Sequence, residues 1–149
     1  MRSFSRSLPM ALLRARETVM RHFRPSLQAF DLTEQQWRVL RALASEQEID
    51  VTGLANVTFL LAPSLTRILR DLERRKIVRR RADPSDLRAA LISLTARGRS
   101  LLQDVGVHSE RIYHALEARF GEPRMKALMS MLAEVENELR EPLRPDDDA

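Results

Sequence analysis

Residues 62–94 read APSLTRILRDLERRKIVRRRADPSDLRAALISL, and this stretch predicts a helix followed by a two-stranded hairpin. Pro63 suits the first position of the helix, because that position needs no N–H. A strand opens at Ile77, and the Asp-Pro-Ser-Asp sequence at residues 83–86 is typical of a tight turn. The apolar side chains predict one buried face on the helix (Leu65, Ile68, Leu69 and Leu72) and one on the returning strand (Ala90, Ile92 and Leu94).

The same stretch concentrates positive charge. Nine Lys and Arg residues stand against four Asp and Glu residues, a net charge of +5, whereas the whole chain carries only +4. A polyanion such as nucleic acid accounts for this concentration. The alternative is a solvated helix face beside a charged edge strand that resists aggregation. The localised charge favours the nucleic-acid partner.

The composition bounds the class of protein. A chain of 149 residues with 44% hydrophobic residues is long enough to bury a core, and we expect a single domain over residues 1–149. No apolar run approaches the length of a membrane span. Arg14, Arg16 and Glu17 interrupt the short apolar run near the N-terminus, so we expect no signal peptide and a cytoplasmic location.

Three helical patterns precede or open the basic stretch. Residues 9–30 predict a long helix, which Pro25 would kink or end. Thr33, followed three residues later by Gln36, has the form of a capping box and predicts a helix through about residue 44. Its buried side chains would be Trp37, Leu40 and Leu43. Asp50 is expected to cap a short third helix whose inward side chains are Leu54, Ala55 and Val57.

Two short helices followed by a basic hairpin predict a winged helix-turn-helix over residues 32–94. Its second helix can lie in the DNA major groove, which alone is wide enough to admit a helix. The hairpin turn is expected to reach the DNA backbone or the adjacent minor groove. The side chains that we expect to bind DNA are Ser64, Thr66, Arg67, Arg70 and Arg74 on the helix, and Arg79, Arg80, Arg81, Asp86 and Arg88 on the hairpin.

Long helices are expected on both sides of this module. Thr95 is the predicted cap of a helix that ends at Gly121, and a last helix follows until Pro142. Residues 142–149 form an acidic tail. The helices at 9–30 and 95–141 carry more apolar surface than one small module covers, so we expect them to form a homodimer that binds a palindromic site. The alternative is that they complete a monomer core.

Motifs for catalysis or for metal binding are not visible. With no cysteine, the three histidines His22, His108 and His114 do not suggest a transition-metal site. There is no glycine-rich phosphate loop and no nucleophile–base pair. We therefore expect a protein that is not an enzyme and that needs no cofactor.

These residues resemble the multiple antibiotic resistance regulator (MarR) family of winged-helix dimers along nearly the whole chain. The resemblance rests on LTEQQWRVLRALA at 32–44, LANVTFLLAPSLTRILRDLERRKIVRR at 54–80 and DPSDLRAALISLTARG at 83–98. The segment SLPMALLRARETVMRHFRPSL at 7–27 resembles the branch that represses homoprotocatechuate degradation operons. The implied fold is mainly α with a small β-hairpin wing, flanked by N- and C-terminal dimerisation helices.

The resemblance implies that Asp86 and Arg88 are the acid–arginine pair of the wing. Two departures stand out. Lys76 occupies a position where members commonly have glycine, so it would carry the penalty of a left-handed conformation, about 1 kcal/mol. Ser85 and Leu87 stand where the wing usually carries arginine, so that Arg79–Arg81 and Arg88 would supply the phosphate contacts.

The resemblance also implies a pocket for a small aromatic acid, a phenol or a coenzyme A thioester, between the dimerisation helices and the DNA module. A guanidinium suits a carboxylate because its fork makes two parallel charge-assisted bonds. Trp37 would stack on the ligand or fill the core, and Arg14 and Arg38 would clamp the ligand or form interhelical salt bridges. The expected pocket residues are Arg14, Arg16, His22, Trp37 and Arg38.

Two functions follow as hypotheses. The first is a repressor of an aromatic-compound catabolic operon, which a small aromatic acid or its thioester releases from a palindromic operator. The second is an architectural DNA-binding or protein-interaction module without an effector. Only the first should discriminate one DNA sequence from another by several kcal/mol.

Overall fold

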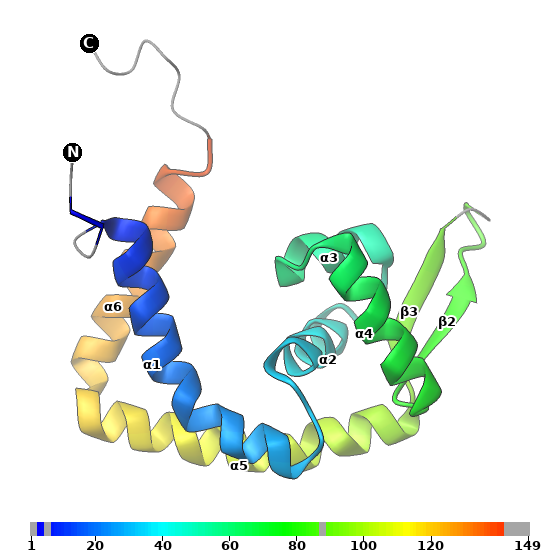
Figure 1. Cartoon of the computed structure of the whole chain (residues 1–149), viewed down its shortest axis with the longest axis horizontal. Coiled ribbons are helices and arrows are strands. Elements are labelled where there is room, and N and C mark those ends of the chain that lie inside the picture. Colours follow the sequence, from blue (N-terminus) through cyan, green and yellow to red (C-terminus); the bar gives the residue numbers. More distant parts are fainter. Residues whose placement is uncertain (1–2, 5–6, 87–88, 142–149) are drawn as a thin grey trace. The chain divides into compact units, whose positions relative to one another are not determined.

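The computed structural model describes residues 3–4, 7–86 and 89–141 (Figure 1). The described chain is mainly helical with a small three-stranded antiparallel sheet, which confirms the predicted fold class. Two compact units are present, Met1–Ser109 and Glu110–Ala149. In chain order the elements are α1 (Leu8–Ala29), α2 (Glu34–Glu46), β1 (Glu48–Asp50), α3 (Val51–Thr58), α4 (Ala62–Arg74), β2 (Val78–Ala82), β3 (Ala90–Leu94), α5 (Ala96–Phe120) and α6 (Glu122–Glu138).

Helices α2 and α3 begin at the predicted caps. Thr33 Oγ1 accepts a hydrogen bond from the Gln36 N–H at 3.1 Å, and Gln36 Oε1 accepts one from the Thr33 N–H at 2.9 Å. Asp50 Oδ1 accepts from the Gly53 N–H at 2.7 Å. The capping box and the Asp50 cap are therefore confirmed, and each satisfies N–H groups that the first turn leaves without a helical partner.

The predicted inward face of α3 is correct for Leu54 and wrong for Val57, whose side chain is 48% exposed. Thr58 takes the inward position instead, because it lies one helical turn after Leu54. Its Oγ1 donates a hydrogen bond to the Leu54 carbonyl at 2.5 Å, which satisfies the buried hydroxyl. A buried hydroxyl bonded to its own helix is not recognisable from hydrophobic spacing.

Helix α4 is fixed by its apolar face. Leu65, Leu69 and Leu72 are fully buried, as predicted, whereas Ile68 is only half-buried. The helix begins at Ala62, so Pro63 occupies its second position and not the first. A proline at the second position costs little, because the N–H groups of the whole first turn have no partner within the helix.

The end of α4 is closed by a left-handed residue, Lys76, with φ 58°. The Lys76 N–H donates to the Glu73 carbonyl and the Ile77 N–H donates to the Leu72 carbonyl, both at 2.9 Å. This is the Schellman pattern, in which glycine is the usual left-handed residue. The position predicted to carry a conformational penalty therefore does adopt the left-handed conformation.

The sheet has the strand order β1–β3–β2, and its short first strand was missed by the sequence analysis. Strand β3 lies in the centre of the sheet, between β1 and β2. Ile92 and Leu94 are buried on one of its faces, as predicted, but Ser93 is buried on the other face, which the sequence pattern did not predict. In β2, Arg79 pairs with Ser93 and Arg80 pairs with Ile92. Because successive side chains of a strand point to opposite faces, Arg79 and Arg80 lie on different faces of the sheet.

Helix α1 continues through Pro25 to Ala29, close to the predicted bounds of 9–30, so of the two expected effects of Pro25 the ending of the helix does not occur. Phe23 and Leu27, which flank the proline, are both buried, and their packing offsets the hydrogen bond that proline removes. Helix α5 starts after the predicted cap, where Thr95 Oγ1 accepts from the Gly98 N–H at 3.0 Å. It ends at Gly121 with φ 98°, as expected.

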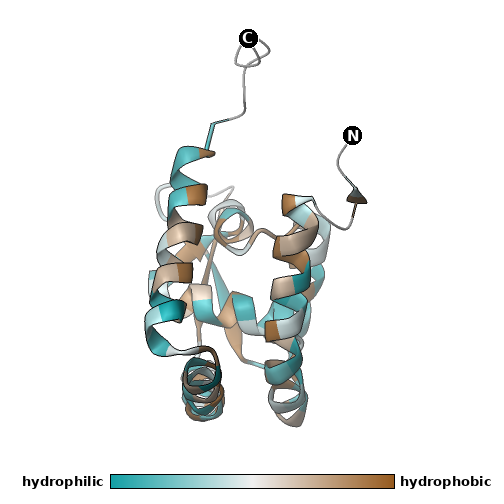
Figure 2. Ribbon diagram, turned by 90° about the vertical axis from the view of Figure 1, so that its left-hand side faces the viewer, coloured by the Kyte–Doolittle hydropathy of each residue, from teal (hydrophilic) through white to brown (hydrophobic). Residues whose placement is uncertain are grey.

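The second unit contains α6, which ends at Glu138, before the expected bound at 141. Figure 2 shows hydrophobic segments recurring along this helix, which leads to the C-terminus. None of its residues is buried, and its exposed apolar side chains are Leu128, Met129, Met131, Leu132 and Val135. The acidic tail predicted at 142–149 lies outside the described residues.

Within the described residues, no single helix is both long and apolar enough to cross a bilayer. Helices α3 and α4 reach that composition only when they are joined across a bend of 109°.

Candidate functional site

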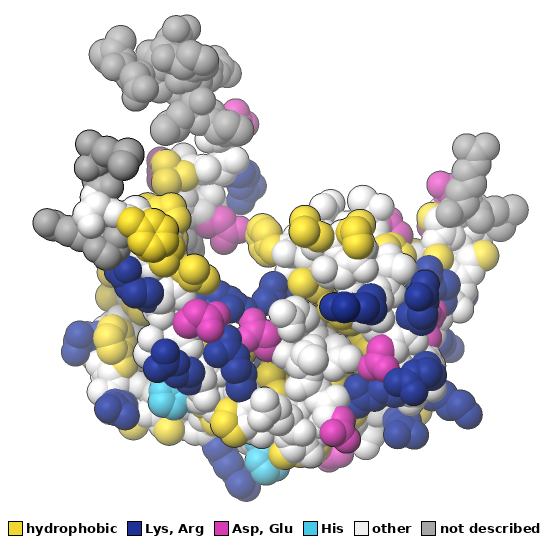
Figure 3. Space-filling view, in the orientation of Figure 1, with side chains coloured by type: hydrophobic (Ala, Val, Ile, Leu, Met, Phe, Trp, Pro, Cys, Tyr) yellow, Lys and Arg dark blue, Asp and Glu magenta, His cyan; other side chains and the backbone are white. Residues whose placement is uncertain are grey.

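The outward face of α4 carries unpaired arginines. Arg67 and Arg70 are exposed, and neither forms an ion pair with any residue that the structure describes. Figure 3 shows Lys and Arg side chains gathered over α4 and the neighbouring strand β2. Because the opposite face of α4 is fully buried, the helix is held from behind while these guanidinium groups face solvent. Such a surface suits a polyanion.

The first two turns of α4 carry the two predicted hydroxyl residues. Thr66 is exposed, and its Oγ1 donates to the Ala62 carbonyl at 2.9 Å, so its lone pairs remain available to accept a hydrogen bond. Ser64 is half-buried. Ser64 and Thr66 lie at the N-terminal end of α4, the helix that also carries Arg67 and Arg70.

Arg74, at the other end of α4, is paired. Its Nη2 lies 2.5 Å from Asp71 Oδ1, and Asp71 Oδ2 also accepts from Gln36 Nε2 at 2.9 Å. Hydrogen bonds from Arg74 and then from Arg75 hold the pKa of Asp71 below its usual range, against the opposing effect of burial. Asp71 thus ties α4 to α2 and partly neutralises the C-terminal end of the predicted DNA surface.

The three arginines of β2 have three different partners. Arg80 Nε donates to Glu73 Oε1 of α4 at 2.9 Å. Arg79 Nε donates to Ser93 Oγ of β3 at 3.0 Å. Arg81 pairs with Glu48 of β1 through two hydrogen bonds, and the hydrogen bond from Arg81 lowers the pKa of the Glu48 carboxyl.

The turn of the wing is shaped by Asp83. Its Oδ1 accepts from the N–H of Ser85 at 2.8 Å and from the Ser85 hydroxyl at 2.7 Å, and these bonds lower the pKa of Asp83. Ser85, where the resemblance led us to expect arginine, therefore stabilises the turn. Asp86 is exposed, whereas Leu87 and Arg88 lie outside the described residues.

The five predicted pocket residues do not line one cavity. Arg14 and His22 are exposed on α1. Arg16 pairs with Glu34, and Arg24 binds the same carboxylate, with Nη2 3.0 Å from Oε2. Arg38 donates to the Thr58 carbonyl at 2.9 Å and lies 3.5 Å from Glu34. Burial raises the pKa of Glu34, but the hydrogen bonds from Arg16 and Arg24 outweigh it, and the net shift is downward.

Trp37 is mostly buried, with 8% of its surface exposed, and it also lines a cavity of about 400 Å³. Arg41 lies beside it, with its guanidinium carbon 5.9 Å from the centre of the indole ring. The remaining lining residues are Ala44, Ser45, Leu102 and Gly106, from α2 and α5. Arg41 is not among the predicted pocket residues, although it lies one helical turn after Trp37, where its side chain can meet the indole.

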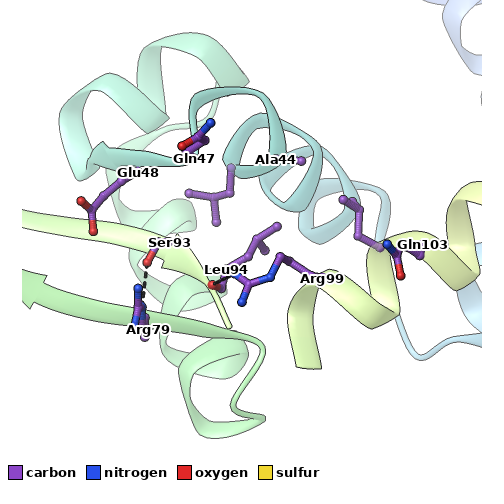
Figure 4. A pocket seen from close by; sticks show the side chains of 10 residues that line it. Ala44, Gln47, Glu48, Arg79, Ser93, Leu94, Arg99 and Gln103 are labelled. Atoms are coloured by element: carbon purple, nitrogen blue, oxygen red, sulfur yellow. Dashed lines mark hydrogen bonds between the residues drawn. The ribbon is translucent and has the colours of Figure 1, made fainter. Parts of the chain in front are cut away.

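A second, larger cleft of about 580 Å³ lies between the sheet, the end of α2 and the start of α5 (Figure 4). No sequence signal pointed to it, because its walls come from three separate parts of the chain, residues 43–48, residue 79 and residues 93–103. Its lining residues are Leu43, Ala44, Gln47, Glu48, Arg79, Ser93, Leu94, Arg99, Leu102 and Gln103.

Comparisons with known proteins place the chain among transcriptional regulators. The MarR family model matches residues 30–89. The homoprotocatechuate degradative operon repressor of Escherichia coli is 41% identical over 128 residues, which cover 86% of each chain. The transcriptional regulator FarR of Neisseria gonorrhoeae is 38% identical over 129 residues, which cover 87% of this chain and 88% of its own.

Solved structures agree in fold along most of the chain. The transcriptional regulator PA4135 superposes with a TM-score of 0.86 at 41% identity, covering 88% of this chain and 96% of its own. NadR in complex with 4-hydroxyphenylacetate has a TM-score of 0.79 at 38% identity, with 91% and 96% covered. The repressor CouR, bound to a DNA duplex, has a TM-score of 0.80 at 31% identity, with 88% and 93% covered. The chain belongs to the MarR family of transcriptional regulators.

Proposed function

We propose that this chain is a sequence-specific DNA-binding repressor that acts in the cytoplasm as a homodimer, with residues 1–149 forming one functional domain. It represses an aromatic-compound catabolic operon and leaves its palindromic operator when a small aromatic acid, or the thioester of one, binds. The observation that carries the proposal is α4, whose apolar face is fully buried while Arg67 and Arg70 stand exposed without ion-pair partners in the described residues.

The DNA contacts divide between bases and phosphates. Ser64, Thr66, Arg67 and Arg70 are assigned to base edges in the major groove, which the N-terminal part of a recognition helix reaches. Arg79 lies on the sheet face that does not carry Arg80, so we assign it no DNA contact. Phosphate and wing contacts are assigned to Arg74, Arg80, Asp86 and Arg88. Arg81 shares the face of Arg79 and is bound by Glu48, so we assign it no DNA contact either.

Dimerisation is supported by apolar surface that each unit leaves uncovered. In the second unit, α6 exposes its leucines and methionines along its length. In the first unit, α1 exposes Leu8, Leu12, Leu13 and Val19. A twofold pair would bury such surfaces and present two copies of α4 to half-sites about 34 Å apart, one turn of DNA.

For the effector we propose the cavity beside Trp37. The indole offers a flat apolar wall, and the Arg41 guanidinium beside it offers the donors that a carboxylate needs. Arg16 and Arg38 already serve the Glu34 ion cluster, so Arg14 and His22 are the predicted α1 residues left for a ligand. NadR, the relative solved with 4-hydroxyphenylacetate, supports an aromatic acid as the class.

The test is fluorescence anisotropy with DNA from upstream of the gene, beside scrambled DNA at matched salt, with and without 4-hydroxyphenylacetate or a hydroxycinnamate. We expect preference for the native DNA and its release by one acid. Specific DNA binding that neither acid changes would contradict the proposed effector. A ligand with equal affinity for the free and the DNA-bound protein does not shift the equilibrium between them. Equal binding to scrambled DNA would leave an architectural module.

A further inference from the structure

We propose a second ligand site, in which Arg79 and Arg99 bind a small organic anion in the cleft between the sheet and α5. The cleft is shown in Figure 4, where Arg79 comes from β2, Arg99 comes from the start of α5, and Ala44 of α2 and Gln47, which follows α2, lie across from them. All of its lining residues belong to the first unit. The site is separate from the DNA surface, because Arg79 lies on the opposite face of β2 from Arg80.

The charge balance of the cleft leaves two positive groups uncompensated. Its charged lining residues are Glu48, Arg79 and Arg99. Glu48 is already bound by Arg81, which makes two hydrogen bonds to its carboxylate. Neither Arg79 nor Arg99 forms an ion pair with a described residue. An anion in the cleft would therefore meet two guanidinium groups that no described carboxylate binds directly, although Glu48 interacts with Arg79 through space.

Both guanidinium groups are held in place by one neutral oxygen each. Arg79 Nε donates to Ser93 Oγ at 3.0 Å, which leaves both of its Nη groups available. Arg99 Nη1 donates to the Leu94 carbonyl at 2.9 Å, which leaves most of its donors available. Because guanidinium carries five N–H donors in a planar fork, each arginine can still bind one carboxylate. The anchoring oxygens come from adjacent residues of β3, so the two arginines are positioned by a single strand.

The rest of the lining indicates the class of anion. Leu43, Leu94 and Leu102 supply apolar wall, and Gln47 and Gln103 supply amides that donate or accept. Inorganic phosphate would leave the leucines unused, whereas a carboxylate on a ring or a short apolar body would use both kinds of surface. We therefore assign the site to an amphipathic carboxylate.

This cleft adjoins the Trp37 cavity but is lined by different arginines. The two share only Ala44 and Leu102, and the arginine of the Trp37 cavity is Arg41. A single chain thus offers two binding places for small acids, each with its own arginines. Substitution of one set therefore separates the second site from the effector site of the proposed function.

The experiment is a titration of the full chain, without DNA, with 4-hydroxyphenylacetate, its neutral amide and inorganic phosphate. Backbone NMR follows the amide signals of Ser93, Leu94 and Gln103 in the cleft, and the single tryptophan reports on the other cavity. We expect the carboxylate to shift the cleft signals in a saturable way, and the amide and phosphate to bind at least about tenfold more weakly.

Variants decide the assignment. Arg79→Gln and Arg99→Gln should each weaken the saturation of the cleft signals by at least about tenfold and leave the tryptophan response unchanged. Arg97→Gln, an exposed α5 residue outside the cleft, removes the same charge and should change neither response. Equal weakening by Arg97→Gln and Arg99→Gln, or cleft signals that no carboxylate moves, would overturn the second site. Neither result depends on whether the chain binds DNA.

Discussion

Arg80 Nε donates a hydrogen bond to Glu73 Oε1 across 2.9 Å, which joins strand β2 of the wing to α4. In the proposed DNA complex, the Glu73 carboxylate would compete with a DNA phosphate for this guanidinium. Glu73→Gln should therefore strengthen binding to native and scrambled DNA alike and steepen the dependence of affinity on salt. Anisotropy titrations at several salt concentrations measure both. Unchanged affinity would mean that Arg80 does not reach the phosphates.

Arg67 and Arg80 are expected to differ in what they read. Arg67→Ala should cost about 1–3 kcal/mol on the native operator and relax the preference at one base pair. Arg80→Ala should weaken all sequences about equally and lower the salt slope by about 1. A panel of single-base operator variants distinguishes the two. If both substitutions behave alike, the assignment of base-reading residues on α4 is wrong.

Gly98 of α5 packs directly against the backbone of Ile77, the residue before β2. A Cβ at this position would fall far inside the van der Waals distance of the Ile77 carbonyl oxygen, which is backbone. Gly98→Ala should lower the free energy of unfolding by about 1–3 kcal/mol or more, because α5 must move away. Gly106 of the same helix is the matched control. No atom lies within 4 Å of its added Cβ, so Gly106→Ala should stabilise by about 0.5–1 kcal/mol. Thermal unfolding of both variants checks the pair.

Lys76 holds φ 58° at the end of α4, where glycine adopts the same conformation without a Cβ penalty. Lys76→Gly should raise the free energy of unfolding by up to about 1 kcal/mol. Arg75→Gly, one residue earlier at φ −79°, should destabilise the chain instead. Denaturant titrations measure both changes. A loss of stability in Lys76→Gly would show that the lysine side chain contributes more than its backbone strain.

The Glu34 cluster makes stability depend on pH. The folded-state pKa of Glu34 lies below its ordinary value of 4.5, so its contribution is present above that value and is lost as pH falls below it. Glu34→Gln should be less stable than the parent at neutral pH, and the difference should shrink as the pH falls from about 5 towards 3. Glu46→Gln, which removes a carboxylate without a described ion pair, is the control. A difference that stays constant with pH would contradict the ionic contribution.

Local signals in the sequence identified four helix ends correctly. Thr33, Asp50 and Thr95 cap the helices they were expected to cap, and Gly121 ends α5. Each depends on a side chain and an N–H within three residues, so no tertiary information is needed. The buried stripe of α4 was equally accessible, because its spacing repeats within one helix.

Features that depend on tertiary packing were not accessible in the same way. Strand β1 has three residues and no alternation, so only its pairing with β3 reveals it. Pro25 remains inside α1 because neighbouring side chains are buried, which a local rule for proline does not include. The cleft around Arg79 and Arg99 is formed by two helices and the sheet, so it exists only in the folded chain. The sequence predicts a DNA contact for Arg79 because Arg79, Arg80 and Arg81 form one basic run, which does not show that alternate side chains lie on opposite faces.

The pleat of β2 has a consequence for how this wing can change by mutation. Point substitution of Arg79 or of Arg80 alters one face of the sheet and leaves the other intact. Insertion or deletion of a single codon before Arg79 would shift the register by one residue, and every later side chain of the strand would change faces. Arg79 and Arg80 would then each point to the face of the sheet that the other had occupied. Changes in wing length should thus alter DNA affinity and acid binding together, whereas changes in wing composition can alter them one at a time.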